Sequence, residues 1–191
     1  INVDGISKGS TANTKAEPNV SAVCVDKGNG MDMYSFISDS LIKSGLAIEK
    51  QDICSYSPLT LAYIGDAVYE LIIRSMIVTE GNAPVNKMHK RSSSLGKAET
   101  QADYIKYMLE HELLNEEEMR IYKRGRNAKS YTSAKNASIN DYRRATGFEA
   151  LIGWLYLKGE FDRMTELIKL GFEGIGAEIL AVPEEALEQE D

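Results

Sequence analysis

The chain has 191 residues, of which 43% are hydrophobic and 27% are charged. These values are typical of one globular domain, and they exclude a membrane-spanning protein because no apolar run approaches the roughly 20 residues that a bilayer span needs. The two cysteines, Cys24 and Cys54, have no CxxC motif or histidine cluster near them. We therefore expect free thiols in a reducing compartment and a cytoplasmic location.

The net charge of −7 argues at first sight against nucleic-acid binding. Its distribution changes that interpretation, because residues 177–191 contain six acidic side chains and no Lys or Arg. The rest of the chain is close to neutral. An acidic end of this kind is typical of a solvated tail, so we expect residues 180–191 to be disordered.

Residues 1–30 are rich in Gly, Ser, Asn, Thr and Lys and show no sustained periodicity. We expect a disordered extension there, and not a targeting signal, because the segment lacks an apolar stretch. The folded domain is expected over residues 31–179. Its hydrophobic period is helical throughout, without strand alternation, which predicts an all-α fold.

Capping signals divide this domain into helices. Gly45 is a C-cap candidate, Ser57 followed by Pro58 marks a helix start, Asn115 precedes three acidic residues, and Ser138 with Asp141 resembles a capping box. The predicted helices cover approximately residues 33–44, 58–78, 84–94, 96–113, 116–125, 138–158 and 161–172.

The helix over residues 58–78 is apolar almost all round, which predicts a central, buried helix. Its few charges, Asp66, Glu70 and Arg74, are spaced four residues apart on one stripe. Glu70 and Arg74 have the favourable order for a helical ion pair. Asp66 lies one turn earlier, between Gly65 and Ala67, where small residues permit a close approach of another helix or a ligand.

The helix over residues 138–158 repeats this arrangement, because Glu149 is the only charge between Arg144 and Lys158. A buried, unpaired carboxylate costs several kcal/mol, so it must be paired, hydrogen-bonded or bound to metal. Local hydroxyls or cations such as Arg143 could satisfy each acid separately. Alternatively, Asp66 and Glu149 converge on a hard cation, Mg²⁺ or Mn²⁺, that supports phosphodiester hydrolysis.

Basic residues gather between Met119 and Asp141 without one acidic side chain among them. They are Arg120, Lys123, Arg124, Arg126, Lys129 and Lys135. An ordinary solvated charge run is one interpretation, and a loop that contacts phosphate oxygens, with a turn at Gly125, is the other. A second cluster, Lys87, His89, Lys90, Arg91 and Lys97, is equally compatible with a solvated helix face and with an RNA contact.

Four separated motifs carry a family resemblance. AYIGDAVYE, at residues 62–70, and FEALIGWLYL, at residues 148–157, resemble the signature segment and the second acidic motif of ribonuclease III. HKRSSSLGKAETQA, at residues 89–102, and KRGRNAKSYTSAKN, at residues 123–136, resemble the mini-ribonuclease III branch in particular. The resemblance covers approximately residues 59–171.

This resemblance implies the all-α ribonuclease III fold, a homodimer with a catalytic valley across both subunits, and cleavage of double-stranded RNA that depends on Mg²⁺, with Mn²⁺ as a substitute. It implies that Asp66 and Glu149 are catalytic metal ligands and that Arg124, Arg126, Lys129 and Lys135 contact RNA. The implied substrate is precursor large-subunit (23S) ribosomal RNA. The sequence does not decide whether a ribosomal protein acts as a helper.

Two departures from full-length ribonuclease III bear on these expectations. Ala62 and Thr146 stand where that enzyme has two further acids, a loss that the mini branch shares. The acidic tail offers no double-stranded-RNA-binding module, so RNA affinity is expected to come from the catalytic domain and to depend strongly on salt. The main rival is a non-catalytic, ribosome-associated RNA-binding protein of the same fold, but such proteins typically lose the acids that this chain retains.

Overall fold

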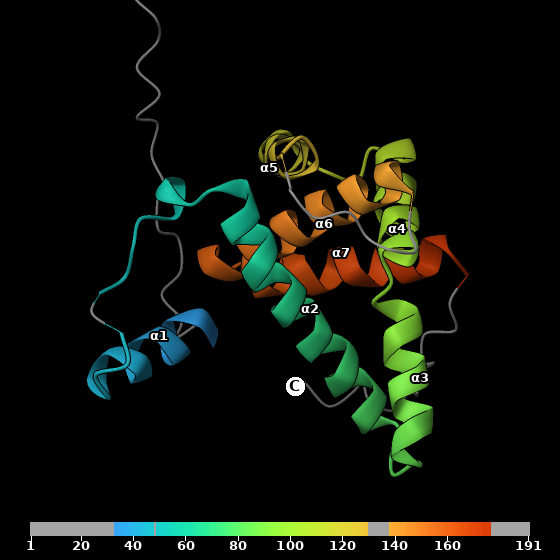
Figure 1. Ribbon diagram of the computed structural model, residues 1–191, viewed down its shortest axis with the longest axis horizontal. Coiled ribbons are helices and arrows are strands. Elements are labelled where there is room, and N and C mark those ends of the chain that lie inside the picture. Colours follow the sequence, from blue (N-terminus) through green and yellow to red (C-terminus); the bar gives the residue numbers. More distant parts are fainter. Residues whose placement is uncertain (1–32, 48, 130–137, 177–191) are drawn as a thin grey trace, which may run out of the picture.

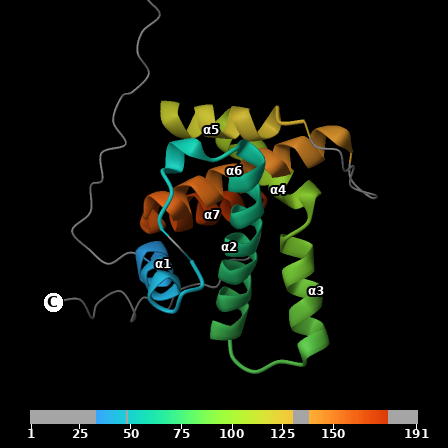
Figure 2. The same ribbon diagram turned by 60° about the vertical axis from the view of Figure 1, so that its left-hand side comes forward.

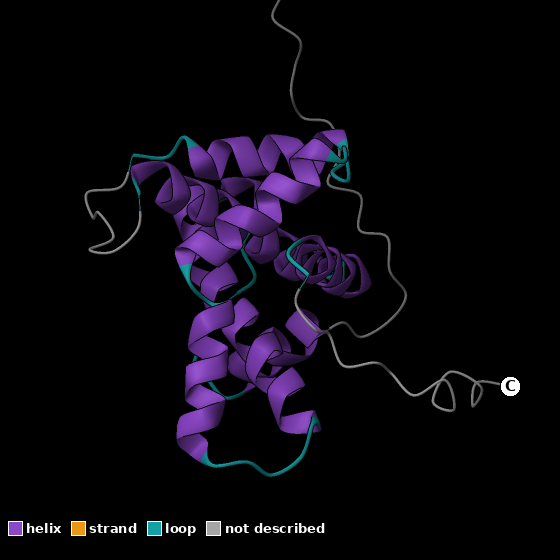
Figure 3. Cartoon of the chain, turned by 90° about the vertical axis from the view of Figure 1, so that its right-hand side faces the viewer, coloured by secondary structure: helices purple, strands orange, loops and turns teal. Residues whose placement is uncertain are grey.

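A computed structural model of the chain describes residues 33–47, 49–129 and 138–176. The predicted N-terminal extension and acidic tail lie outside these residues. The described part is helical, as the hydrophobic period predicted, and Figure 3 shows helices and connecting loops only. Its elements are α1 (Met33–Lys43), the short 3₁₀ helix η1 (Ile53–Ser55), α2 (Pro58–Thr79), α3 (Val85–Leu95), α4 (Ala98–Glu110), α5 (Glu116–Arg126), α6 (Ile139–Lys158) and α7 (Phe161–Gly174).

Helix α6 is the centre of the fold, and α2, α4, α5 and α7 all pack against it (Figure 1). Residues 145–156 are all buried except Glu149. Helices α2 and α3 run side by side, and their connected ends extend away from α5, α6 and α7 (Figure 2). The apolar run of α6 is therefore explained by neighbours on every side, and Glu149 is the one charged residue within it.

Glycines permit α2 and α6 to cross in close contact. A Cβ atom on Gly65 would collide with the carbonyl oxygen of Glu149 and would lie 2.7 Å from the amide nitrogen of Gly153. A Cβ atom on Gly153 would collide in turn with the carbonyl oxygen of Leu61. Because the obstacles are backbone atoms, a side chain at either glycine would force the two helices apart.

The capping signals are confirmed. Ser57 caps α2 by accepting a hydrogen bond from the Thr60 amide, and Asn115 forms a complete capping box with Glu118. Ser138 accepts from the Asp141 amide at 3.1 Å, and Gly45 ends the turn after α1 with a φ of +74°. Each terminus thus satisfies backbone groups that a helix end would leave unpaired.

The prediction that α2 is buried all round is wrong for a single chain. One face packs on the core, whereas Tyr63 is 82% exposed, Leu71 51% and Val78 62%. Leu59, at 39%, belongs to the same face. We call these four residues the α2 stripe, since they recur at intervals that place them on one side of a helix. In the described part of the chain, no element covers the stripe.

The prediction that Gly125 begins a turn is also wrong. Helix α5 continues to Arg126, and Gly125 is buried inside it. A Cβ there would lie 2.7 Å from the Cβ of Ala150 and 3.0 Å from the Cα of Gly147, so this glycine lets α5 approach α6. Lys123, Arg124 and Arg126 consequently belong to the last helical turn of α5 and not to a loop.

A buried ion pair fixes the orientation of α5. The Glu118 side chain is 1% exposed and accepts from Arg163 of α7 at 2.8 Å. Burial acts to raise the pKa of Glu118, but hydrogen bonds from Arg163 and from the Asn115 backbone outweigh it and lower the pKa. The same guanidinium donates to the Leu113 carbonyl at 2.7 Å. These contacts anchor the start of the helix whose far end carries the basic residues.

Candidate active site

Asp66 and Glu149 meet where α2 crosses α6. Asp66 directly follows Gly65, the residue that touches the backbone of Glu149. Asp66 is exposed on the single chain, and Glu149 is half-buried. The prediction that Asp66 is buried is therefore wrong. Asp66 is close enough to Glu149 for its charge to raise the pKa of that acid.

The electrostatics of the pair oppose two negative charges. Burial, followed by the nearby charge of Asp66, raises the pKa of Glu149 to about 8, and the nearby amide of Gln101 lowers it in part. The pKa of Asp66 is raised by partial desolvation and then by the charge of Glu70. Without an added cation, Glu149 is therefore largely protonated at neutral pH.

Local cations do not neutralise these acids. Arg74 donates to Glu70 at 2.8 Å, which confirms the predicted helical ion pair and engages the arginine nearest to Asp66 along the helix. Neither Asp66 nor Glu149 forms an ion pair with any described residue. No set of three or more Asp, Glu, His or Cys side chains in the described ranges has the arrangement of a metal site.

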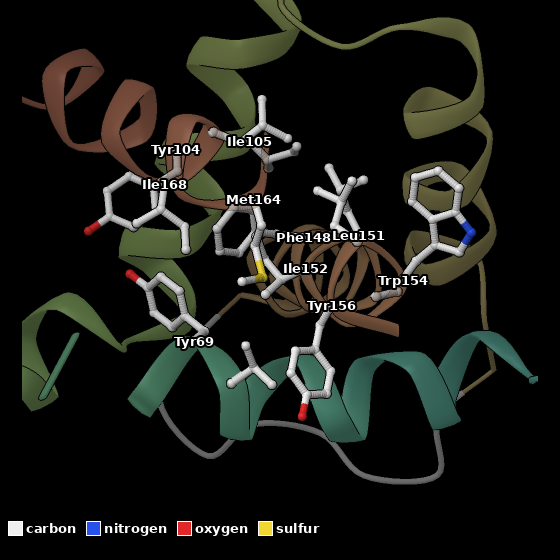
Figure 4. Close-up of a cluster of buried hydrophobic side chains, with 14 of the residues drawn as sticks. Tyr69, Tyr104, Ile105, Phe148, Leu151, Ile152, Trp154, Tyr156, Met164 and Ile168 are labelled. Atoms are coloured by element: carbon white, nitrogen blue, oxygen red, sulfur yellow. The ribbon is translucent and has the colours of Figure 1, made fainter. Parts of the chain in front are cut away.

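Three aromatic rings form a cluster on α4 and on the two helices that carry the acids, α2 and α6. Tyr69 contacts Phe148 with ring centroids 5.4 Å apart, and Tyr104 lies 6.0 Å from Phe148 and 6.5 Å from Tyr69. Figure 4 shows these side chains together within the core. The rings come from α2, α6 and α4, so they fix three helices relative to one another directly beside the acids.

Sequence reasoning missed Gln101 of α4. Its side chain is 1% exposed, and neither its amide nitrogen nor its amide oxygen has a hydrogen-bond partner of ordinary geometry among the described residues. The amide is nevertheless close enough to Glu149 to lower the pKa of that acid. The helical period could have identified it, because Gln101 shares the buried face of α4 with Ile105 and Met108.

The basic residues are placed at the C-terminal end of α5. Arg124, Arg126 and Lys129 are exposed, and Arg124 donates to the Tyr56 carbonyl at 3.4 Å. Lys135 lies outside the described residues. An open hollow follows one side of α5 and is lined by Glu116, Met119, Arg120, Lys123, Arg124 and Asn127. In the second basic cluster, Arg91 forms an ion pair with Glu80, while Lys87, His89 and Lys90 are exposed.

Comparisons with known proteins agree with this fold. Residues 59–160 match the Ribonuclease III domain, which defines the class of the protein. A mini-ribonuclease 3 from Clostridium tetani is 52% identical over 127 residues, which are 66% of this chain and 83% of the relative. One from Thermoanaerobacter is 48% identical over 128 residues, or 67% of this chain and 89% of the relative.

A solved structure extends the likeness to three dimensions. A crystal structure from Fusobacterium nucleatum is 30% identical, with a TM-score of 0.58, and the match covers 66% of this chain and 99% of that one. The chain therefore belongs to the mini-ribonuclease 3 family. The predicted family, all-α fold and endoribonuclease class are confirmed. None of the described helices is long and apolar enough to cross a membrane.

The raised pKa of Glu149 predicts a pH-dependent effect of Glu149→Gln on stability in metal-free buffer. Between the ordinary value of 4.5 and about 8, the folded chain keeps a proton that the unfolded chain releases, so the wild type loses stability as pH rises through this range. Glutamine removes this loss. We expect the variant to gain about 1–3 kcal/mol at pH 9 and much less at pH 5, since one pKa unit corresponds to about 1.4 kcal/mol and partial solvent exposure reduces the effect.

Urea unfolding at both pH values measures this difference. The matched control is Glu110→Gln on α4, whose side chain is 59% exposed. Its effect should be small and equal at both pH values. A gain from Glu149→Gln that does not change between pH 5 and pH 9 would contradict the raised pKa.

Proposed function

We propose that this endoribonuclease cuts double-stranded RNA and that Asp66 and Glu149 are its catalytic residues. The observation that carries the proposal is the pair itself: two carboxylates from different helices, held together at a glycine crossing and left without a protein cation among the described residues. A protein selected for packing alone gains nothing from such a pair, because like charges at close range destabilise the fold.

The donor set fits a hard divalent cation, for which we propose Mg²⁺ with Mn²⁺ as a substitute. Both ions prefer oxygen ligands, and Asp66 and Glu149 would supply them from one exposed and one half-buried carboxylate. The raised pKa of Glu149 marks a place where added positive charge would be stabilising. When bound, the cation would lower the pKa of a coordinated water and neutralise charge that develops on the phosphate.

Glu149, Asp66 and the aromatic cluster have separate roles in this mechanism. Glu149 must release its proton to act as a ligand, and its fixed position on the central helix limits how far it can move. Asp66 is exposed and lies on the side from which RNA can approach. The aromatic cluster of Tyr69, Tyr104 and Phe148 holds α2 and α6 in fixed positions relative to each other, so that both acids can act at the same phosphate.

Phosphate contacts are assigned to Arg124, Arg126, Lys129 and Lys135. Three of them are exposed at or just after the end of α5, and no acid interrupts the sequence from residue 120 to residue 140. An A-form duplex is recognised mainly through its backbone and 2′-hydroxyls, because its major groove is too narrow for side chains. A cationic helix end suits such recognition better than reading of the bases.

For the biological substrate we propose precursor 23S ribosomal RNA, as the family resemblance implies. A ribosomal protein that presents this precursor is a further partner to test. The rival function is RNA binding without cleavage. The retained Asp66 and Glu149 favour the enzyme, because a binding protein would have no use for two close, unpaired acids.

We further propose that the chain works as a homodimer through the α2 stripe, Leu59, Tyr63, Leu71 and Val78. Their exposed fractions, from 39% to 82%, are high for apolar side chains on one face of a helix, which they share with the ion pair of Glu70 and Arg74, and exposed apolar groups of this kind mark interaction surfaces. Asp66 lies between Tyr63 and Leu71 on the same helix. A second copy on the stripe would therefore border the acidic pair and form one valley with two sites.

The first prediction from this proposed function concerns cleavage of a long RNA duplex in Mg²⁺. Asp66→Asn and Glu149→Gln should bind the duplex as the wild type does but cut it more than about 100-fold more slowly, because each removes an oxygen ligand of the cation. Glu110→Gln is the matched control and should cut at the wild-type rate. Single-turnover cleavage and filter binding measure the two steps separately.

If the wild type binds RNA but does not cut it, precursor 23S RNA is the next substrate to test. Failure to cut that precursor as well would favour the binding function. Full cleavage by either acid variant would contradict the assignment of the catalytic residues.

The second prediction concerns salt. The plot of log affinity against log salt has a negative slope. Arg124→Gln and Arg126→Gln should each make it shallower by about 1, because each removes one phosphate contact. Lys169→Gln, at an exposed position on α7, is the control and should leave the slope unchanged. Titrations between low and high salt measure the slopes. An arginine variant with the wild-type slope would show that this arginine does not contact RNA phosphate.

The third prediction concerns assembly. Tyr63→Asp should convert dimers to monomers, because it places a charge in the middle of the α2 stripe. Ile139→Asp, at a 67% exposed apolar residue that begins α6, should remain dimeric. Sedimentation velocity measures both masses. A monomeric wild type, or a dimeric Tyr63→Asp variant, would contradict this interface.

A further inference from the structure

Gln101 is an anomaly in an otherwise apolar interior. It lies on α4 with 1% of its surface exposed, and its neighbours on the same face, Ala102, Ile105 and Met108, are all buried. Both polar atoms of its side chain lack a partner of ordinary hydrogen-bond geometry in the described part of the chain. Burying an unpaired amide costs free energy, so the fold bears a cost here that a leucine or methionine would avoid.

The position of Gln101 in the fold indicates a function for this unpaired amide. Tyr69, Phe148 and Tyr104 form one cluster of touching rings from three helices. Asp66 precedes Tyr69 by three residues, Gln101 precedes Tyr104 by three, and Glu149 directly follows Phe148. One turn along each of α2 and α4 therefore leads from the cluster to Asp66 and to Gln101, and the next residue of α6 is Glu149. Of these three polar residues, Glu149 lies close enough to both Asp66 and Gln101 for each of them to change its pKa.

The chemistry of the amide fixes its orientation. A carboxylate accepts hydrogen bonds, so the NH₂ group of Gln101 must face Glu149, where its donation favours the charged form of the acid. The amide oxygen is then free to accept. Two carboxylates leave most of the six positions around a Mg²⁺ ion to water and RNA, and a buried carbonyl-type oxygen can orient such a water.

We propose that Gln101 is a positioning residue of the active site, whose NH₂ group holds the Glu149 carboxylate in place and whose amide oxygen accepts a hydrogen bond from a water bound to the cation. This role rests on the metal site proposed above. It gives a function to the amide oxygen, which has no partner of ordinary hydrogen-bond geometry among the described residues.

The test is Gln101→Met, which keeps the approximate size of the side chain and removes both polar atoms. The variant should unfold at the wild-type temperature or above it, because an unpaired buried amide is lost. Its midpoint for Mg²⁺ activation of duplex cleavage should rise about 10- to 100-fold, as is typical when a residue that orients a metal ligand is removed. The rise in unfolding temperature that Mn²⁺ produces in the absence of RNA should shrink correspondingly, which provides a readout independent of cleavage.

Ser92→Ala is the control. It removes the hydroxyl of a buried residue of α3, which donates to the His89 carbonyl at 3.1 Å, and should leave the Mn²⁺ response and the Mg²⁺ midpoint unchanged. Gln101→Leu serves as a second variant if methionine does not fold. Both variants should bind RNA as the wild type does, because Gln101 is buried.

The outcomes separate this role from the metal site itself. A wild type that responds to Mn²⁺ and a Gln101→Met variant that responds equally would overturn the role of Gln101 alone. A wild type that neither responds to Mn²⁺ nor requires a divalent ion for cleavage would overturn the metal site and the Gln101 role together. A rise in the Mg²⁺ midpoint for Gln101→Met but not for Ser92→Ala would support the proposal.

Discussion

The close crossing of α2 and α6 is the constraint on which the site depends. Gly65 and Gly153 let the two backbones touch, and a side chain at either position would collide with a backbone carbonyl. This contact sets the separation of Asp66, next to Gly65, from Glu149, whose own carbonyl forms part of the crossing. Packing and function are therefore coupled at the same atoms, because a change that separates the helices also separates the acids.

The crossing also brings two carboxylates close together, which is electrostatically unfavourable when both are charged. Burial and the charge of Asp66 raise the pKa of Glu149 to about 8, so the pair resists full ionisation until positive charge arrives. Another buried acid of the fold, Glu118, is paired with Arg163 at 2.8 Å and has a lowered pKa. This contrast between the two acids is expected if Glu149 belongs to a site that binds a cation.

The sequence predicted the helices well because their signals are local. Ser57, Asn115 and Ser138 cap the helices that they were expected to cap. It predicted the burial of α2 poorly, since the apolar residues of a helix do not tell from the sequence alone which of them a neighbouring element covers. Gly125 was misinterpreted because a glycine that permits helix contact has the same letter as one that permits a turn. Gln101 escaped notice because its importance arises only when α4 and α6 are brought together.

Anomalous X-ray scattering from crystals grown with Mn²⁺ tests the central claim most directly, because it locates the ion without reference to activity. The account predicts at least one Mn²⁺ peak at about 2.2 Å from carboxylate oxygens of both Asp66 and Glu149. Such a peak would establish that the two helices hold one cation between them. Mn²⁺ bound elsewhere, with Asp66 and Glu149 directed into separate environments, would contradict the account.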